Sequence, residues 1–232
     1  MNIEQRVMQV RQEIEKAQIA RVAAGFTAEE VKLIAVTKNQ EVEAIREAVD
    51  CGIVAIGENR VQEAAGKYTV LERNAEWHLI GHLQKNKVRN SVPIFDLIHS
   101  VDNESLAQEI NRIAAREGKV QDILLQINIG DEATKFGFPP TDLKRMATFC
   151  SKLPNVRICG IMAIAPYCDD PETIRPLFRE LYRLFTELKF AQLPNADIKW
   201  LSMGMTNDYR VAVEEGANMV RIGTAIFGAR VK

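Results

Sequence analysis

Short runs of apolar and β-branched residues recur along the chain, and a stretch with helical periodicity follows most of them. The runs are nearly continuous in apolar residues, which is typical of parallel strands that are covered on both faces. Amphipathic stretches such as "NESLAQEINRIAAREG" and "TDLKRMATFCSKL" lie between the runs, with Asn103, Thr141 and Gly118 as cap residues. The pattern predicts eight strands, over residues 32–38, 53–59, 78–82, 97–101, 123–128, 157–165, 198–203 and 219–227.

Eight strands that alternate with helices favour a closed (β/α)₈ TIM barrel, for which about 250 residues is typical. Few residues follow the eighth strand, so the long helical pattern from Ile3 to Ala24 is expected to supply the last outer helix. A doubly wound open sheet is the alternative. The first strand has no GxGxxG after it, where a dinucleotide-binding sheet needs its phosphate turn, and this favours the barrel. No linker divides the chain, so we expect one α/β domain over residues 1–232.

The composition is that of a soluble globular protein, with 47% hydrophobic and 26% charged residues. A formal net charge of -1 gives no field that would favour nucleic acid or an anionic membrane. No apolar stretch approaches the roughly 20 residues of a membrane span. The N-terminus mixes charges throughout and has no signal-peptide core. The four cysteines lack CxxC spacing and are interpreted as reduced thiols, so we expect a cytoplasmic protein.

The residues where barrel strands end carry the chemistry, because the active site of such a barrel forms there. Lys38 ends the first predicted strand and shares a face with Ile34 and Val36, by the period of two. One interpretation is a lysine whose stem packs while its amine reaches water. The other is a desolvated amine that is suited to Schiff-base chemistry with an aldehyde.

The stretch "WLSMGMTND" is a second candidate, because a strand ends there at Ser202 and a helix follows. Gly204 follows the strand, and Thr206, Asn207 and Asp208 can cap that helix, whose free backbone N–H groups could bind an anion. An ordinary strand-to-helix turn has the same composition.

The stretch "MVRIGTAIFG" is the third candidate. Arg221 lies on a strand that is covered on both faces, so its guanidinium needs a partner. That partner is either an internal carboxylate or a ligand. Gly223 and Thr224 add donors in the loop where barrels often hold phosphate. An aldehyde for Lys38, a phosphate for Ser202, Gly223 and Thr224, and an acceptor for Arg221 together describe pyridoxal 5′-phosphate.

The chain also closely resembles the YggS/PROSC family of pyridoxal-phosphate-binding homeostasis proteins. The matching stretches run in order from Leu33 to Gly228 and include "AVTKNQ", "GENRVQE", "WHLIGHLQKNK", "HSVD", "QINIGDEATKFGF", "GIMAIAP" and "LSMGMTNDYRVAVEEGANMVRIGTAIFG". The resemblance implies a barrel like the N-terminal domain of bacterial alanine racemase, of fold type III among pyridoxal-phosphate proteins. It implies six cofactor-binding residues: an aldimine at Lys38, phosphate contacts from Ser202, Gly223 and Thr224, Arg221 at the pyridine nitrogen, and Asn59 beside the ring.

The site residues favour a cofactor carrier over an enzyme, with no catalytic residue assigned. A racemase needs an acid/base on each face of the substrate, and Lys38 serves one. In the racemases that this chain resembles, the other is a tyrosine of a second domain, which we expect to be absent here; Tyr167 is the nearest candidate. Arg221 only donates hydrogen bonds, so the pyridine nitrogen stays unprotonated and a carbanion is poorly stabilised.

We therefore expect a vitamin B6 homeostasis protein that buffers pyridoxal phosphate and supplies it to apo-enzymes. The alternatives are a low-activity amino-acid racemase and a cofactor-free Schiff-base aldolase. The expected state is a monomer without nucleic-acid or membrane partners.

Three other signals concern charged or metal-binding side chains. Lys135 in "DEATKFGF" is either a solvated loop lysine or a second docking amine. His78 and His82 share a predicted strand face but lack a third zinc ligand, so no metal is expected. The basic run "KNKVR" is interpreted as a solvated helix face.

Overall fold

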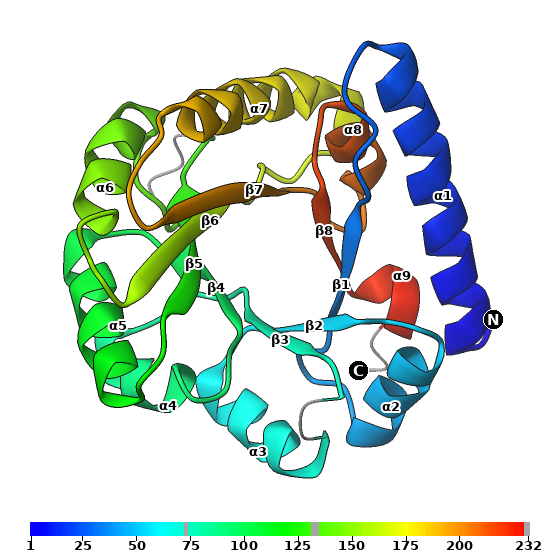
Figure 1. Cartoon of the computed structure of the whole chain (residues 1–232). Coiled ribbons are helices and arrows are strands. Elements are labelled where there is room, and N and C mark those ends of the chain that lie inside the picture. The colour runs from blue at the N-terminus through cyan, green and yellow to red at the C-terminus, as the bar shows by residue number, and fades with distance from the viewer. Residues whose placement is uncertain (72–73, 131–134, 230–232) are drawn as a thin grey trace.

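Eight parallel strands close into a barrel in the order in which they occur along the chain, within the computed structural model of residues 1–71, 74–130 and 135–229. Figure 1 looks along the barrel, with the helices forming a ring outside the strands. The strands are β1 (Lys32–Val36), β2 (Ala55–Glu58), β3 (Glu76–Leu79), β4 (Leu97–Val101), β5 (Gln121–Ile127), β6 (Val156–Ala163), β7 (Ala196–Ser202) and β8 (Met219–Ile222). The predicted barrel is therefore confirmed, and each predicted strand overlaps an observed one.

The helical layer covers the outer face of these strands. Its helices are α1 (Ile3–Ala23), α2 (Val42–Asp50), α3 (Val61–Leu71), α4 (Val88–Ser91), α5 (Glu104–Arg116), α6 (Leu143–Cys150), α7 (Arg175–Phe190), α8 (Tyr209–Glu214) and α9 (Thr224–Phe227). Asn103 accepts from the Leu106 amide and caps α5, as predicted. Helix α1 packs against α8, α9 and α2, so the N-terminal helix does complete the outer ring.

The last predicted strand was too long. Strand β8 ends at Ile222, and residues 224–227 form the short helix α9, in which Ile226 is fully buried. A short apolar run suits a buried strand and a buried helix equally, so its composition did not distinguish them.

The predicted strand 78–82 also ends early, at Leu79. Gly81 lies against the backbone of Asn59, where an added Cβ would clash. His82 therefore lies beyond the strand and does not share a strand face with His78.

The barrel interior is filled in two parts. An apolar cluster is contributed by alternate inward positions and consists of Ile34, Ala55, Leu97, Leu124, Cys159, Met162 and Met219. The other part is polar and fully enclosed, and it consists of His78, His99, Ser202 and Arg221. Gly160 allows β6 and β7 to approach there: it has φ +146°, and a Cβ would clash with the Trp200 carbonyl.

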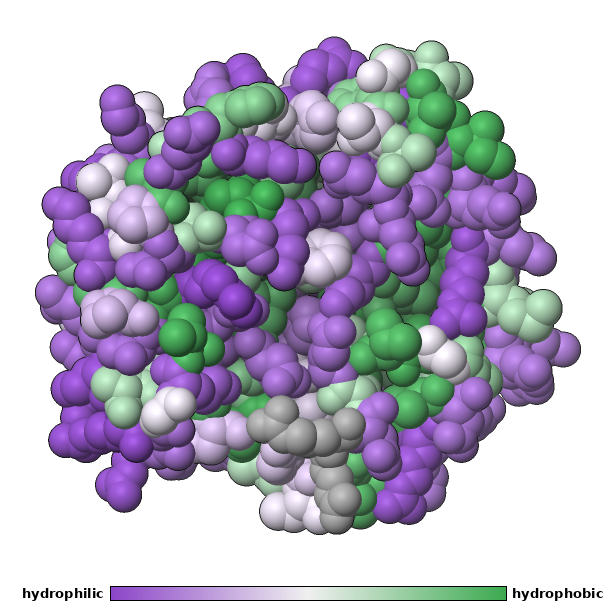
Figure 2. Space-filling view, viewed as in Figure 1, coloured by the Kyte–Doolittle hydropathy of each residue, from purple (hydrophilic) through white to green (hydrophobic). Residues whose placement is uncertain are grey.

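The outer surface is mainly polar on the face seen in Figure 2, where hydrophobic side chains form small separate patches. Among the described residues, no helix has both the length and the apolar character that crossing a membrane requires.

Candidate functional site

A cavity of about 440 Å³ opens where β1, β6, β7 and β8 end. Chain segments that are far apart in sequence contribute to its wall: Val36 and Lys38, Lys135, Ile164–Cys168, Met205–Asp208, Arg221, and Gly223–Thr224. This end of a parallel barrel is the one at which catalytic and binding residues gather. Four of the six predicted cofactor-binding residues therefore line one cavity: Lys38, Arg221, Gly223 and Thr224.

The Lys38 side chain is half-buried and enters the cavity from the end of β1. Ile34, four residues earlier, belongs to the inner apolar cluster, so the predicted alternation along this strand is confirmed. Within the described ranges, the Lys38 amine makes no hydrogen bond or ion pair. It is available to react with or bind a ligand in the cavity.

A buried ionic cluster holds the backbone on both sides of Lys38. The Lys67 amine donates to the Thr37 carbonyl at 2.6 Å, and to Glu58 and Glu63 at 2.7 Å each. The Thr37 hydroxyl donates to Glu58 at 2.6 Å, and the Asn39 amide donates to Glu63 at 2.5 Å. We call this group, Thr37, Asn39, Glu58, Glu63 and Lys67, the β1 clamp. It fixes the turn that presents Lys38.

Burial has the largest effect on the pKa of Glu58 in the β1 clamp. It raises the pKa of Glu58, against the opposing effect of the hydrogen bonds from Lys67 and Thr37. Sequence reasoning missed Glu58 and Lys67. The available signal was a glutamate at the end of a predicted buried strand, since such a residue is rarely enclosed without a cation.

Arg221 is 3% exposed, and neutral groups accept its hydrogen bonds. Its Nη1 donates to the Ser202 hydroxyl at 2.6 Å, and its Nη2 donates to the Ala163 carbonyl at 2.8 Å. Burial lowers the pKa of Arg221 to about 10, and the charge of Asp208 acts in the opposite direction. The guanidinium is therefore charged at neutral pH, with one carboxylate near it and its remaining donors at the cavity.

Ser202 and Asn59 lie outside the cavity wall. Ser202 is fully buried beneath Arg221, and its hydroxyl also lies 3.1 Å from Nδ1 of His99. Asn59 is half-buried at the end of β2, against Gly81. These two predicted residues therefore do not line the cavity with the other four, although Ser202 contacts Arg221 directly.

The turn between β7 and α8 forms one side of the cavity. Gly204 has φ +94°, and a Cβ there would lie 2.7 Å from that of Ala212. Asp208 precedes α8, but its carboxylate accepts from the Met205 amide at 2.6 Å and not from the helix, so the predicted cap is absent. Burial raises the pKa of Asp208. Asp208 was predicted only as a cap, and its place beside Arg221 was missed.

Two further predicted residues lie at the cavity. Tyr167 lines it but is 79% exposed. Lys135 is half-buried on the wall and donates to the Ala165 carbonyl at 3.2 Å. It is thus not a fully solvated loop side chain.

The histidines do not form a metal site in the described ranges. No group of three or more His, Cys, Asp or Glu side chains there could hold an ion. His82 stacks on Phe136, with ring centroids 3.7 Å apart.

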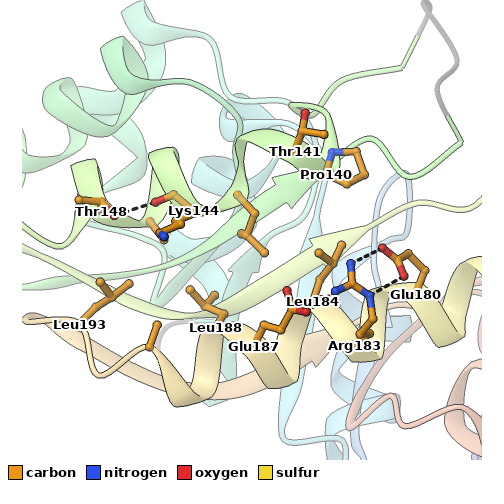
Figure 3. Close-up of a pocket in the computed structure, with 13 residues that line it drawn as sticks. Pro140, Thr141, Lys144, Thr148, Glu180, Arg183, Leu184, Glu187, Leu188 and Leu193 are labelled. Atoms are coloured by element: carbon orange, nitrogen blue, oxygen red, sulfur yellow. Dashed lines mark hydrogen bonds and ion pairs between the residues drawn. The ribbon is translucent and has the colours of Figure 1, made fainter.

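A larger cavity, of about 570 Å³, lies between α6 and α7 on the outside of the barrel (Figure 3). Apolar residues such as Leu184 and Leu188 line it, and Arg183 pairs with Glu180 and Glu187 on its edge. Arg183, Glu180 and Glu187 are paired with one another, and the cavity lacks the convergent polar groups of the strand-end cavity.

The comparisons with known proteins match nearly the whole chain. The family model for the alanine racemase N-terminal domain matches residues 13–231. A curated relative from Aquifex aeolicus, named pyridoxal phosphate homeostasis protein, is 44% identical and covers 99% of both chains. One from Escherichia coli with the same name is 39% identical over 93% of both chains.

Solved structures agree with the sequence matches. PipY from Synechococcus elongatus, solved with PLP bound, has a TM-score of 0.82 and 37% identity, over 98% of this chain and 100% of that one. An alanine racemase from Clostridium difficile has a TM-score of 0.70 at 17% identity, over 94% of this chain and 57% of that one. The second match concerns the fold alone.

Proposed function

This chain belongs to the alanine racemase N-terminal domain family, and we propose on that basis that it binds pyridoxal 5′-phosphate. Its role is to buffer this cofactor and to supply it to apo-enzymes, in keeping with relatives that are named pyridoxal phosphate homeostasis proteins. Residues 1–232 act as one barrel domain, a cytoplasmic monomer with reduced cysteines.

The observation that carries the proposal is that Lys38 and Arg221 line the same cavity. An amine without a partner in the described ranges faces the same space as a buried guanidinium that retains unused donors. The cavity volume lies within the usual range of about 300–1,000 Å³ for small-molecule sites. The residues present therefore fit pyridoxal phosphate, which supplies an aldehyde that an amine can bind covalently.

Each cavity residue has a role that follows from its donors and acceptors. Lys38 supplies the amine, and the β1 clamp fixes the turn that carries it. Arg221 would donate to the ring nitrogen and would leave it unprotonated, because a guanidinium has no acceptor. Gly223 and Thr224 supply backbone and hydroxyl donors to the phosphate. Asn59 and Ser202 do not line the cavity: Asn59 would border the ring from the end of β2, and Ser202 would act through Arg221, from which its hydroxyl oxygen accepts a hydrogen bond.

The same residues favour a carrier over a racemase. Tyr167 is the tyrosine at the cavity, and a side chain that is 79% exposed is not held as a second acid/base. Arg221 also weakens the electron sink that amino-acid chemistry needs.

Visible absorption of the purified protein tests the proposal. We expect a yellow protein whose band is lost in Lys38→Ala, and borohydride reduction followed by peptide mass mapping should place the cofactor on Lys38. Incubation with D- and L-amino acids should give no significant turnover. A colourless protein that cannot be reconstituted with added cofactor would refute the proposal and favour the aldolase.

Lys135 supplies a second amine at the cavity, and we propose that it assists departure of the cofactor. Lys135→Ala should slow transfer to an apo-enzyme while leaving the adduct on Lys38 intact. An unchanged transfer rate would remove this role.

A further inference from the structure

A continuous chain of hydrogen-bonded side chains crosses the inside of the barrel and ends at Arg221. It begins at Glu76, which is 48% exposed at the start of β3 and pairs with Lys32 of β1 at 2.7 Å. Glu76 Oε2 lies 3.2 Å from His78 Nε2, and His78 Nδ1 lies 2.9 Å from His99 Nε2. His99 Nδ1 lies 3.1 Å from the Ser202 hydroxyl. We call Glu76, His78, His99, Ser202 and Arg221 the core chain.

The two histidines of the core chain are neutral. Both are fully buried, and burial lowers the pKa of each. The charges that face His78 are Glu76, Lys32 and Asp96. Those that face His99 are His78, if protonated, and Arg221, and both would oppose a positive charge. A neutral imidazole has one N–H donor and one bare acceptor nitrogen.

The carboxylate of Glu76 gives the core chain one direction. An ionised carboxylate only accepts, so His78 must donate from Nε2 and accept at Nδ1. His99 must then donate from Nε2 to His78 and accept at Nδ1. The Ser202 hydroxyl supplies that proton. If every hydrogen bond of the core chain ran in the opposite direction, Nε2 of His78 would carry no proton. It would then face the lone pairs of the Glu76 carboxylate, and two acceptors repel each other.

The direction of the chain determines what Ser202 can offer to the site. Its single proton goes to His99, so its oxygen is left to accept from Nη1 of Arg221 at 2.6 Å. The Ala163 carbonyl holds Nη2. Because a guanidinium is planar, these two acceptors fix the direction of its remaining donors at the cavity.

We propose that His78 and His99 are positioning residues that keep Ser202 as a hydrogen-bond acceptor for Arg221, with Glu76 at the far end setting the direction. Ser202 thus anchors Arg221 and does not give its hydroxyl proton to a phosphate. The expected effect on cofactor binding rests on the proposed function. The direction of the hydrogen bonds in the core chain can be tested without any ligand.

Nitrogen NMR of isotope-labelled histidine in the ligand-free protein tests the direction. We expect both His78 and His99 to be neutral with the proton on Nε2 at neutral pH. The exposed His82 serves as the solvent-accessible reference. An Nδ1–H tautomer or an imidazolium at either buried position overturns the proposal.

Glu76→Gln tests the origin of the direction. This side chain is half-exposed, so the fold should persist, and an amide can either donate or accept. A second tautomer of His78 and His99 should therefore appear. Tautomer populations identical to those of the wild type would show that Glu76 does not set the direction of the core chain. They would overturn the role proposed for Glu76.

Equilibrium binding of pyridoxal phosphate then tests the positioning role. His99→Phe should weaken binding by about 10- to 100-fold and shift the visible band. The Ser202 hydroxyl then has no histidine to accept its proton, so it is no longer held as an acceptor for Arg221. His82→Phe, the same substitution outside the core chain, should do neither.

Unchanged affinity and spectrum in a folded His99→Phe protein would refute the positioning role and leave the proposed function intact. If His99→Phe does not fold, Glu76→Gln provides the same comparison with a smaller expected loss. Failure of the wild type to bind would refute the proposed function, and the histidine tautomers would still decide the direction of the chain.

Discussion

At the scale of single residues, one cluster of buried charges is arranged around the segment that carries Lys38. Glu58 is fully enclosed, yet Lys67 and Thr37 both donate to it. Removing one member of such a group is costly, because the other remains as an uncompensated buried charge. The β1 clamp is therefore the part of the site most sensitive to conservative substitution.

We expect Lys67→Met to destabilise the protein by about 3–5 kcal/mol, because Glu58 keeps its burial and loses its cation. Lys16→Met breaks an exposed pair with Glu13 and should cost at most about 1 kcal/mol. Urea unfolding of the two variants measures both. Equal effects would mean that the clamp is not a buried ionic group.

The buried histidines predict how stability depends on pH. The folded pKa values of His78 and His99 lie below the unfolded value, so the unfolded chain binds more protons below about pH 6.5. Stability is then lost as the pH falls through 6.5, by about 1.4 kcal/mol per pH unit for each histidine that stays neutral.

His99→Phe isolates one of these two contributions. The slope of unfolding free energy between about pH 6 and 5 should be smaller than that of the wild type by about 1.4 kcal/mol per unit. Urea denaturation at several pH values measures the slope. Identical slopes would show that His99 gains a proton in the folded state.

At the scale of elements, turns that require a particular backbone geometry set the wall of the cavity. The turn after β7 needs a positive φ at Gly204 and brings Asp208 beside Arg221. Strand β8 ends at Ile222, which lets Gly223 and Thr224 turn into the cavity.

Gly204→Ala should destabilise the protein by more than about 1 kcal/mol, since the new Cβ meets Ala212 and the backbone of Tyr209 at positive φ. It should also weaken cofactor binding. Gly66→Ala is the matched control, because nothing lies within 4 Å of its Cβ in α3, and it should stabilise by about 0.5–1 kcal/mol. Thermal unfolding of both variants checks the sign, and a stable Gly204→Ala would contradict this account of the turn.

Helix α1 completes the outer ring and should contribute accordingly to stability. Ile14 is buried on its inner side, so Ile14→Ala should cost about 2–5 kcal/mol. Met8, on the same helix, is largely exposed, and Met8→Ala should stay within about 0.5 kcal/mol of the wild type. Chemical denaturation measures both. A small loss for Ile14→Ala would show that α1 is loosely attached.

At the scale of the whole molecule, the four free cysteines are distributed over distinct environments. Burial raises the pKa of Cys150 and of Cys159 to about 12, so neither forms much reactive thiolate at neutral pH. Cys168 is half-buried and lines the strand-end cavity, whereas Cys51 is half-buried at the end of α2.

Alkylation followed by mass mapping should modify Cys168 before Cys150 and Cys159. Pyridoxal phosphate should slow modification of Cys168 and leave that of Cys51 unchanged, because only Cys168 of this pair lines the cavity. Equal protection of both thiols, or none at Cys168, would place the cofactor elsewhere.

The sequence by itself determined the features that follow from local periodicity. Runs of apolar residues located the strands, and the period of two placed Lys38 on the same face as Ile34 and Val36. The ends of these strands named Lys38, Gly223 and Thr224, and the expected burial of a guanidinium named Arg221; the structure brings all four to one cavity. The resemblance to a known family added the identity of the ligand.

Only the tertiary structure decided the contacts between strands. His99 and Ser202 are 103 residues apart, and barrel closure and register bring them together. The β1 clamp, the burial of Ser202 and the place of Asp208 depend on the same closure. The end of β8 was also decided at this level, because a short apolar run satisfies either a strand or a helix until its neighbours are in place.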